Sequence, residues 1–168
     1  MEQNVISTER KRLSNMAVFW LCLIGTVGIG LAISYCSGIL RGIGSLSGLP
    51  FTLPAWFVIA IPPMLFVVLG LALFFTLREN VYTHNGNVMR AWTVAFWIAL
   101  FGMIATTPYA MMYNNSVGAY VMITIASALA LGTTILMFRQ NVAAGVLSAI
   151  VLVWAVLIMV YFGFWAFA

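Results

Sequence analysis

Five long, predominantly apolar runs limit what this chain can fold into. They lie at about 16–35, 54–77, 88–112, 117–138 and 142–167. A helix needs about 20 apolar residues to cross the hydrocarbon core of a bilayer. Since that core offers the backbone no water to bond, such segments cross it as helices. The sequence therefore predicts an all-α integral membrane protein, a bundle of five transmembrane helices.

Charged side chains are scarce along the whole chain. Of 168 residues, 64% are hydrophobic and 6% are charged. A soluble domain carries about 25% charged residues, so a water-exposed surface cannot be built here. The length suits a polar cytoplasmic N-terminal tail at 1–15 and a single transmembrane domain at 16–168. The net charge of +4 does not indicate nucleic acid, because no aromatic-basic groove is visible.

The basic residues divide unequally between the two predicted sides of the membrane. One side holds Arg10, Lys11, Arg12, Arg78, Arg90 and Arg139. The other side holds Arg41 alone. The positive-inside rule therefore predicts that the N-terminus lies inside and the C-terminus outside. We expect the first run to be a retained helix, because it is longer than the apolar part of a signal peptide. The short loops favour a prokaryotic cytoplasmic membrane.

Polar or glycine-rich segments separate the predicted helices. The predicted loops and turns are 36–53, 78–87, 113–116 and 139–141. Within the second of these, Asn85-Gly86 is a turn signal. Pro62-Pro63 lies inside the second apolar run and predicts a kink there, because proline lacks the N–H that a helix interior needs.

Small residues recur four apart on two of the predicted helices. On the first helix these are Gly28 and Ala32, and Gly30, Ser34 and Gly38. On the fourth they are Ala126 and Ala130, and Ala128 and Gly132. Because lipid supplies no hydrophobic drive between helices, small faces allow close backbone approach. They predict either tight packing within the chain or the seam of a homodimer.

Side chains that carry chemistry are rare. The single histidine, His84, lies in a predicted loop, which excludes a haem held by two histidines and a multi-histidine metal centre. No acid lies within a predicted span, so the usual carboxylate of an ion-coupled transporter or a catalytic triad is missing. Cys22 and Cys36 would lie roughly 20 Å apart on one helix, too far to form a disulfide. We therefore expect that this protein is not an enzyme.

Aromatic side chains are the most frequent remaining candidates for a function. They make up 14% of the chain, and Phe66, Trp97 and Trp154 fall in the middle of predicted spans. An apolar, aromatic-lined pocket between helices suits a flat hydrophobic ligand. The same residues could instead pack the core or face lipid.

From the second span onward, the sequence resembles the TspO/MBR family (tryptophan-rich sensory protein, or translocator protein), whose members have five membrane helices and about this length. The family signature has an aromatic, a proline pair, a Trp, a Tyr, and a Gly 14 residues after the Trp. The matching positions here are Phe51, Leu53-Pro54, Trp56, Phe66 and Gly70. Later positions that resemble the family are Pro108, Thr133-Thr134, Phe138, Ala144-Gly145 and Trp154.

The sequence departs from the family at several polar or aromatic positions. Gly42-Ile43 replaces a Trp-Tyr pair, Ile150-Val151 replaces Pro-Tyr, and Phe162 replaces an Asn. The Asp of the family's fourth helix is missing. The resemblance therefore covers residues 50–165 with partial motifs.

The resemblance implies a pocket for porphyrins (including haem-like molecules), sterols or similar flat apolar molecules, opening toward the first loop. It implies that Trp154, Ile158 and Tyr161, which share one helix face, contact the ligand. The further ligand-binding candidates are Phe51, Trp56 and Trp97. We expect a membrane receptor or sensor. Two alternatives are a structural subunit of a larger membrane complex, such as a respiratory one, and a passive small-solute transporter.

Overall fold

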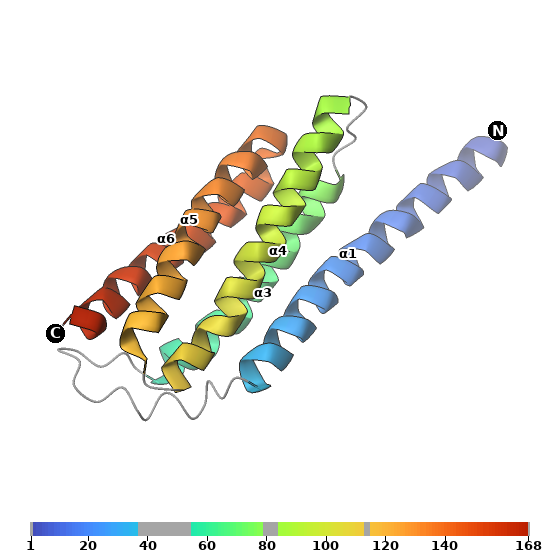
Figure 1. Cartoon of the computed structure of the whole chain (residues 1–168). Coiled ribbons are helices and arrows are strands. Elements are labelled where there is room, and N and C mark those ends of the chain that lie inside the picture. The colour runs from blue at the N-terminus through green and yellow to red at the C-terminus, as the bar shows by residue number, and fades with distance from the viewer. Residues whose placement is uncertain (1, 37–54, 79–83, 113–114, 168) are drawn as a thin grey trace.

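The computed structural model describes residues 2–36, 55–78, 84–112 and 115–167 (Figure 1). In these segments it contains five helices and confirms the all-helical prediction. The helices are α1 (Glu2–Cys36), α3 (Ala55–Arg78), α4 (His84–Met112), α5 (Ser116–Gln140) and α6 (Val142–Phe167). Residues 37–54 lie outside the described part of the chain. They include most of the predicted first loop, with Arg41, Phe51 and Pro54.

Four of these helices are long and apolar enough to cross a membrane. Their apolar segments are Asn15–Ile33, Gly86–Thr107, Ser116–Gln140 and Val142–Phe167. In α3 the described side chains form a shorter apolar segment, Pro63–Arg78. The helix itself continues through Pro62 and Pro63 without interruption, and the kink expected there stays a prediction.

The helices run alternately up and down (Figure 1). Helix α4 packs on α5, α5 on α6, α6 on α3, and α3 on α1, while α1 also touches α4. Because neighbours in sequence alternate in direction, the ends of α3 and α5 that carry Arg78 and Arg139 lie together with the start of α4, which carries Arg90. One end of the bundle is therefore basic.

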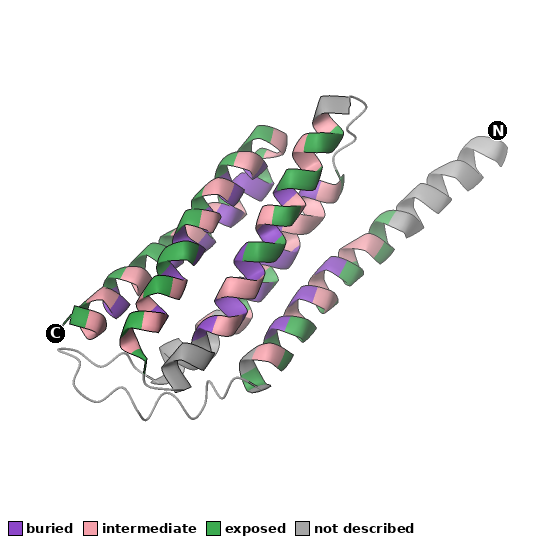
Figure 2. Ribbon diagram, in the orientation of Figure 1, coloured by how far each residue is buried: buried purple, intermediate pink, exposed green. Residues whose placement is uncertain are grey.

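Helix α1 lies largely outside the packed bundle. It begins at Glu2, so the polar tail expected at 1–15 is helical from its second residue, and it extends beyond the other helices (Figure 1). Among its residues whose burial is described, most are exposed or partly buried (Figure 2). Only 17% of its apolar segment is buried. The buried positions Cys22, Thr26 and Gly30 are four residues apart and form one narrow stripe.

That stripe of α1 packs antiparallel against α3. The rings of Phe19 and Phe74 meet edge to face with centroids 5.1 Å apart. One turn further, a Cβ added to Gly70 would lie 3.1 Å from the carbonyl oxygen of Cys22. Further still, a Cβ added to Gly30 would lie 2.6 Å from Cγ of Phe66. Glycines on both helices therefore allow the close approach that lipid-embedded helices need.

The small faces predicted from the sequence divide between two environments. Ala126 and Ala130 are fully buried within the bundle, which is the packing expected of an intramolecular contact. Gly28 and Ala32 are exposed on α1, and a Cβ at Gly28 would meet no atom within 4 Å. The Ala126–Ala130 face of α5 thus packs within the chain. A homodimer seam on the Gly28–Ala32 face of α1 stays a prediction.

Two of the predicted loop boundaries are wrong. The expected turn at Asn85-Gly86 lies in the first turn of α4, which begins at His84. A first turn tolerates polar residues and glycine, because its N–H groups have no partner within the helix in any case. The expected turn at 139–141 is shorter, since Arg139 and Gln140 still belong to α5.

Asn141 alone joins α5 to α6. Its extended backbone ends α5, and its N–H donates to the carbonyl of Met137 at 2.8 Å. Its side-chain Oδ1 accepts from the N–H groups of Ala143 at 2.8 Å and Ala144 at 3.2 Å. One residue therefore caps both helices, which explains how the connection can be so short.

Candidate ligand-binding site

The structure describes four of the six side chains predicted to bind a ligand. Phe51 lies outside the described residues, and for Trp56 only the position of the backbone in α3 is described. The other four lie on α4 (Trp97) and on α6 (Trp154, Ile158 and Tyr161). All four belong to the hydrophobic core or pack against it.

Trp97 is a packed core residue that ties α4 to α3. It is 8% exposed, and its indole Nε1–H donates to the carbonyl of Leu69 at 3.1 Å. Its ring stacks on that of Phe101 with centroids 5.4 Å apart and planes 4° apart. The ring of Phe101 in turn meets that of Phe66 at 5.4 Å. Because its N–H and its ring face both have partners within the protein, Trp97 is better suited to support a pocket wall than to bind a ligand directly.

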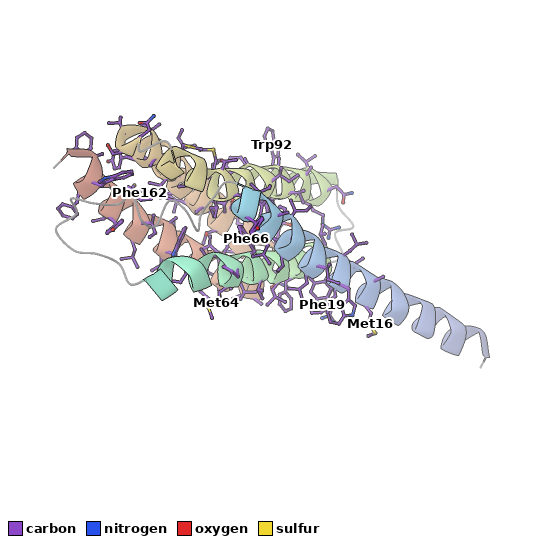
Figure 3. The ribbon with its side chains drawn as sticks, turned by 90° about the horizontal axis from the view of Figure 1, so that it is seen from below. Met16, Phe19, Met64, Phe66, Trp92 and Phe162 are labelled. Carbon is purple, nitrogen blue, oxygen red and sulfur yellow. The ribbon has the colours of Figure 1, made fainter. Side chains whose placement is uncertain are left out.

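Phe66 is the member of this aromatic cluster that contacts α1, and Phe101 lies between it and Trp97. The ring of Phe66 is fully buried and points between α1 and α3, whereas Met64, two residues earlier, points away from the bundle (Figure 3). Because the side chain of Phe66 carries no polar atom, it offers a ligand only apolar and aromatic contact.

Trp154, Ile158 and Tyr161 lie on one face of α6. Trp154 and Ile158 are partly buried, and Tyr161 is 5% exposed. The rings of Tyr161 and Phe162 lie 5.9 Å apart, and Phe162 lies equally far from Trp165. Three neighbouring rings therefore lie in the second half of α6. This half of the helix lies at the end of the bundle where α1 ends and α3 begins (Figure 1).

Trp154 is the one member of this group with an unsatisfied polar atom. Its Nε1 is buried and has no hydrogen-bond partner among the described residues. Leaving a buried donor without an acceptor costs about 1–3 kcal/mol. The indole N–H of Trp154 is therefore suited to an acceptor atom on a bound molecule.

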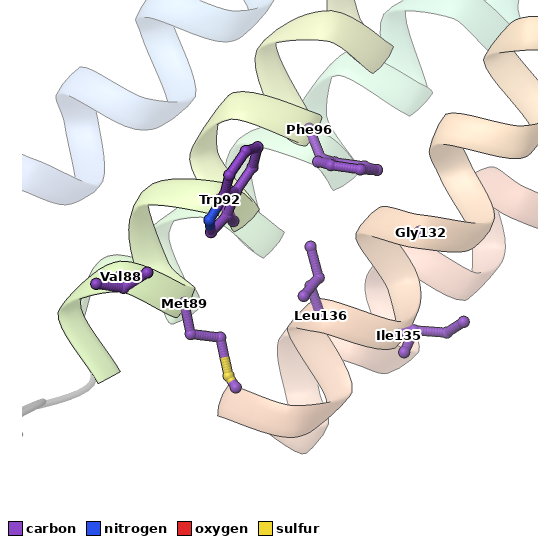
Figure 4. A pocket seen from close by; sticks show the side chains of 7 residues that line it. All are labelled: Val88, Met89, Trp92, Phe96, Gly132, Ile135 and Leu136. Atoms are coloured by element: carbon purple, nitrogen blue, oxygen red, sulfur yellow. The ribbon is translucent and has the colours of Figure 1, made fainter. Parts of the chain in front are cut away.

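A hollow lies between α4 and α5, where sequence patterns predicted none. It has a volume of about 580 Å³. Its lining residues are Val88, Met89, Trp92, Phe96, Gly132, Ile135 and Leu136 (Figure 4). We call it the α4–α5 groove. Neither Trp97 nor the α6 residues line it. No sequence signal could have located it, because it depends on how two helices that are apolar all round face one another.

Two pairs of polar side chains join neighbouring helices inside the bundle. Thr134 Oγ1 and Ser148 Oγ lie 3.0 Å apart and join α5 to α6. The side-chain amide of Gln140 donates to Thr93 Oγ1 and joins α5 to α4. Among the described residues, no three His, Cys, Asp or Glu side chains are grouped so that they could hold a metal ion.

The bundle thus combines an aromatic interior, a basic end and long apolar helices suited to lipid. Comparison with protein-family models, with curated proteins and with solved structures finds no match to this chain.

Proposed function

We propose that this protein is a membrane receptor or sensor that binds a flat, hydrophobic molecule, such as a porphyrin or a sterol, inside its helix bundle. It would act without catalysis, as a divergent relative of the TspO/MBR type. The buried indole N–H of Trp154, which has no partner among the described residues, carries this proposal. It adds a specific donor to an aromatic helix face that the resemblance implies for ligand contact.

The mode of binding follows from what the described side chains can offer. Aromatic and aliphatic surfaces dominate the α6 face, so stacking and burial would supply most of the affinity. Ligand pockets of this kind use a few placed polar groups to orient the bound molecule. Trp154 would donate to one acceptor on the rim of the ligand, while Ile158 and Tyr161 would contact its face.

The orientation in the membrane forms part of the same proposal. All five helices would span the bilayer, with the basic end of the bundle inside and the C-terminus outside. The support is the alternating helix direction, which gathers Arg78, Arg90 and Arg139 at one end. The C-terminal half of α6, which carries Tyr161, Phe162 and Trp165, would then lie toward the outer side of the membrane.

The test is a titration of the purified protein in mild detergent with protoporphyrin IX. Following the absorbance of the porphyrin, rather than Trp emission, avoids the loss of signal when a Trp is replaced. Wild type should saturate near one porphyrin per chain. Trp154→Phe removes the N–H and should weaken binding about fivefold, the value of roughly one hydrogen bond.

Trp20→Phe is the matched control, because Trp20 is 51% exposed on α1 and should leave binding unchanged. Thermal unfolding without ligand separates binding from folding. Trp154→Phe should be as stable as wild type, because it removes an unsatisfied donor and breaks no bond described within the chain. Linear, unsaturable porphyrin uptake that is equal in all three proteins would refute the proposal and favour the structural subunit of a larger complex.

A further inference from the structure

We infer that the α4–α5 groove is a binding site for an anionic phospholipid. One acyl chain would lie in the groove, and the headgroup would lie beside Arg139. This site is separate from the interior pocket proposed above, because the two share no lining residue.

The groove has the shape and surface that an acyl chain needs. Its volume of about 580 Å³ falls in the range of small-molecule sites, and all the described residues that line it are uncharged. From Val88 to Phe96 it extends along two turns of α4, about 12 Å at 1.5 Å per residue. Each buried CH₂ group of a chain in such a groove contributes about 0.8 kcal/mol relative to water.

Glycine and aromatic side chains create the hollow. Gly132 has no side chain, and a Cβ there would lie 2.7 Å from Cε1 of Phe96. The ring of Phe96 therefore lies over the backbone of α5 and closes one end of the groove (Figure 4). Near the other end, the bonds from Gln140 to Thr93 and to the carbonyl of Met89 hold α4 and α5 together.

The groove opens outward, where the lipid would be. Trp92 is 60% exposed, Ile135 48% and Val88 45%. In Figure 3 the side chain of Trp92 points away from the bundle. Because α4 and α5 are both long and apolar enough to cross a membrane, the groove faces acyl chains rather than water. A lipid is therefore the occupant that its surroundings supply.

The position of Arg139 selects an anionic lipid. Arg139 follows Leu136 by three residues and Ile135 by four, so it lies on the same face of α5, one turn beyond the groove. Its side chain is exposed. That end of the bundle also carries Arg78 and Arg90. A basic residue at the mouth of a groove between membrane helices is the arrangement that recognises an acidic headgroup.

Trp92 completes the match between groove and lipid. Its indole nitrogen faces the Val88 end of the groove, the end nearest Arg139 (Figure 4). Trp side chains favour the level of the headgroups, where the ring meets acyl chains and the N–H meets polar atoms. The groove therefore provides apolar contact along its length and polar contact at one end.

Native mass spectrometry of the protein in mild detergent tests the inference, with phosphatidylglycerol and phosphatidylcholine of equal chain length as probes. Wild type should bind the anionic lipid more tightly. Arg139→Gln should lower that preference about fivefold, the equivalent of roughly 1 kcal/mol per basic residue, and Arg139→Lys should restore it. Arg78→Gln, which removes an exposed charge at the same end but away from the groove, should leave the preference unchanged.

A second pair of variants tests the groove itself. Ile135→Trp fills it from an exposed position and should reduce binding of both lipids. Ile125→Trp adds the same bulk at a position on α5 that is 47% exposed and outside the groove, and should have no effect. Equal binding of the two lipids by wild type, equal losses in Arg139→Gln and Arg78→Gln, or equal losses in the two Trp variants would each overturn the inference. A dimer of the chain that displaces lipid would overturn it too.

Discussion

The contact between α1 and α3 allows a sharp test, because two glycines on one helix differ only in what they face. Gly30 is buried against Phe66, whereas Gly28 is exposed with no atom within 4 Å of a Cβ. Replacing either one with Ala raises the helix propensity of α1 by about 1 kcal/mol. The stability difference between the two variants therefore reports the packing at position 30 alone.

The structure indicates how large that difference should be. A Cβ at position 30 would lie 2.6 Å from Cγ and Cδ2 of Phe66 and 2.8 Å from Cδ1. Because these atoms include the base of the ring, rotating the ring does not relieve the clash. Phe66 is fully buried and its ring also meets that of Phe101 at 5.4 Å, so it has little room to move. Overpacking of this kind costs about 1–3 kcal/mol.

We therefore expect Gly30→Ala to be about 1–3 kcal/mol less stable than Gly28→Ala. Gly28→Ala itself should equal or exceed wild type. The assay is unfolding by sodium dodecyl sulfate in mixed micelles, followed by Trp fluorescence, with the midpoint and slope fitted for each protein. If the two variants unfold at the same detergent fraction, α1 does not pack on Phe66 as described, and the reasoning fails.

Two further predictions concern the short α5–α6 connection and the orientation in the membrane. Asn141→Ala removes the side-chain cap of α6 and should lower the free energy of unfolding by about 1 kcal/mol in the same assay. Asn141→Asp keeps an acceptor at that position and should lower it less. Equal losses of stability in the two variants would contradict the capping role. A phosphatase that is active only outside the cytoplasm, fused after Phe167, should be active, and the same enzyme inserted after Gln140 should be inactive; the reverse result would invert the proposed topology.

The location of the helices could be predicted from the sequence because it depends on local composition. A run of apolar residues long enough to span a bilayer becomes a helix whatever its neighbours are. The predicted fifth run, 142–167, coincides with α6, and the fourth, 117–138, lies within α5. Boundaries were less predictable where capping decides them. At Asn141, hydrogen bonds of a single residue shorten a turn that polarity alone predicted to be longer.

The candidate site was only partly predictable, because helices that are apolar all round do not reveal which side faces inward. Trp92 and Trp97 lie on the same helix, yet Trp92 lines an outward groove and Trp97 is buried against Leu69. Likewise, Gly28 and Gly30 are indistinguishable as small residues, and only Gly30 meets another helix. That the N–H of Trp154 lacks a partner in the described part of the chain also appears only once its surroundings are known.

The sequence by itself determined that the chain forms long apolar helices and carries few charged residues, because both follow from residue types and their order. Only the tertiary structure decided which aromatic rings stack, which glycines allow contact, and where α4 and α5 leave a groove. These features arise from the rotation and spacing of each helix against its neighbours. In a lipid-embedded bundle, that arrangement is selected by close packing and a few hydrogen bonds rather than by a polar and an apolar face.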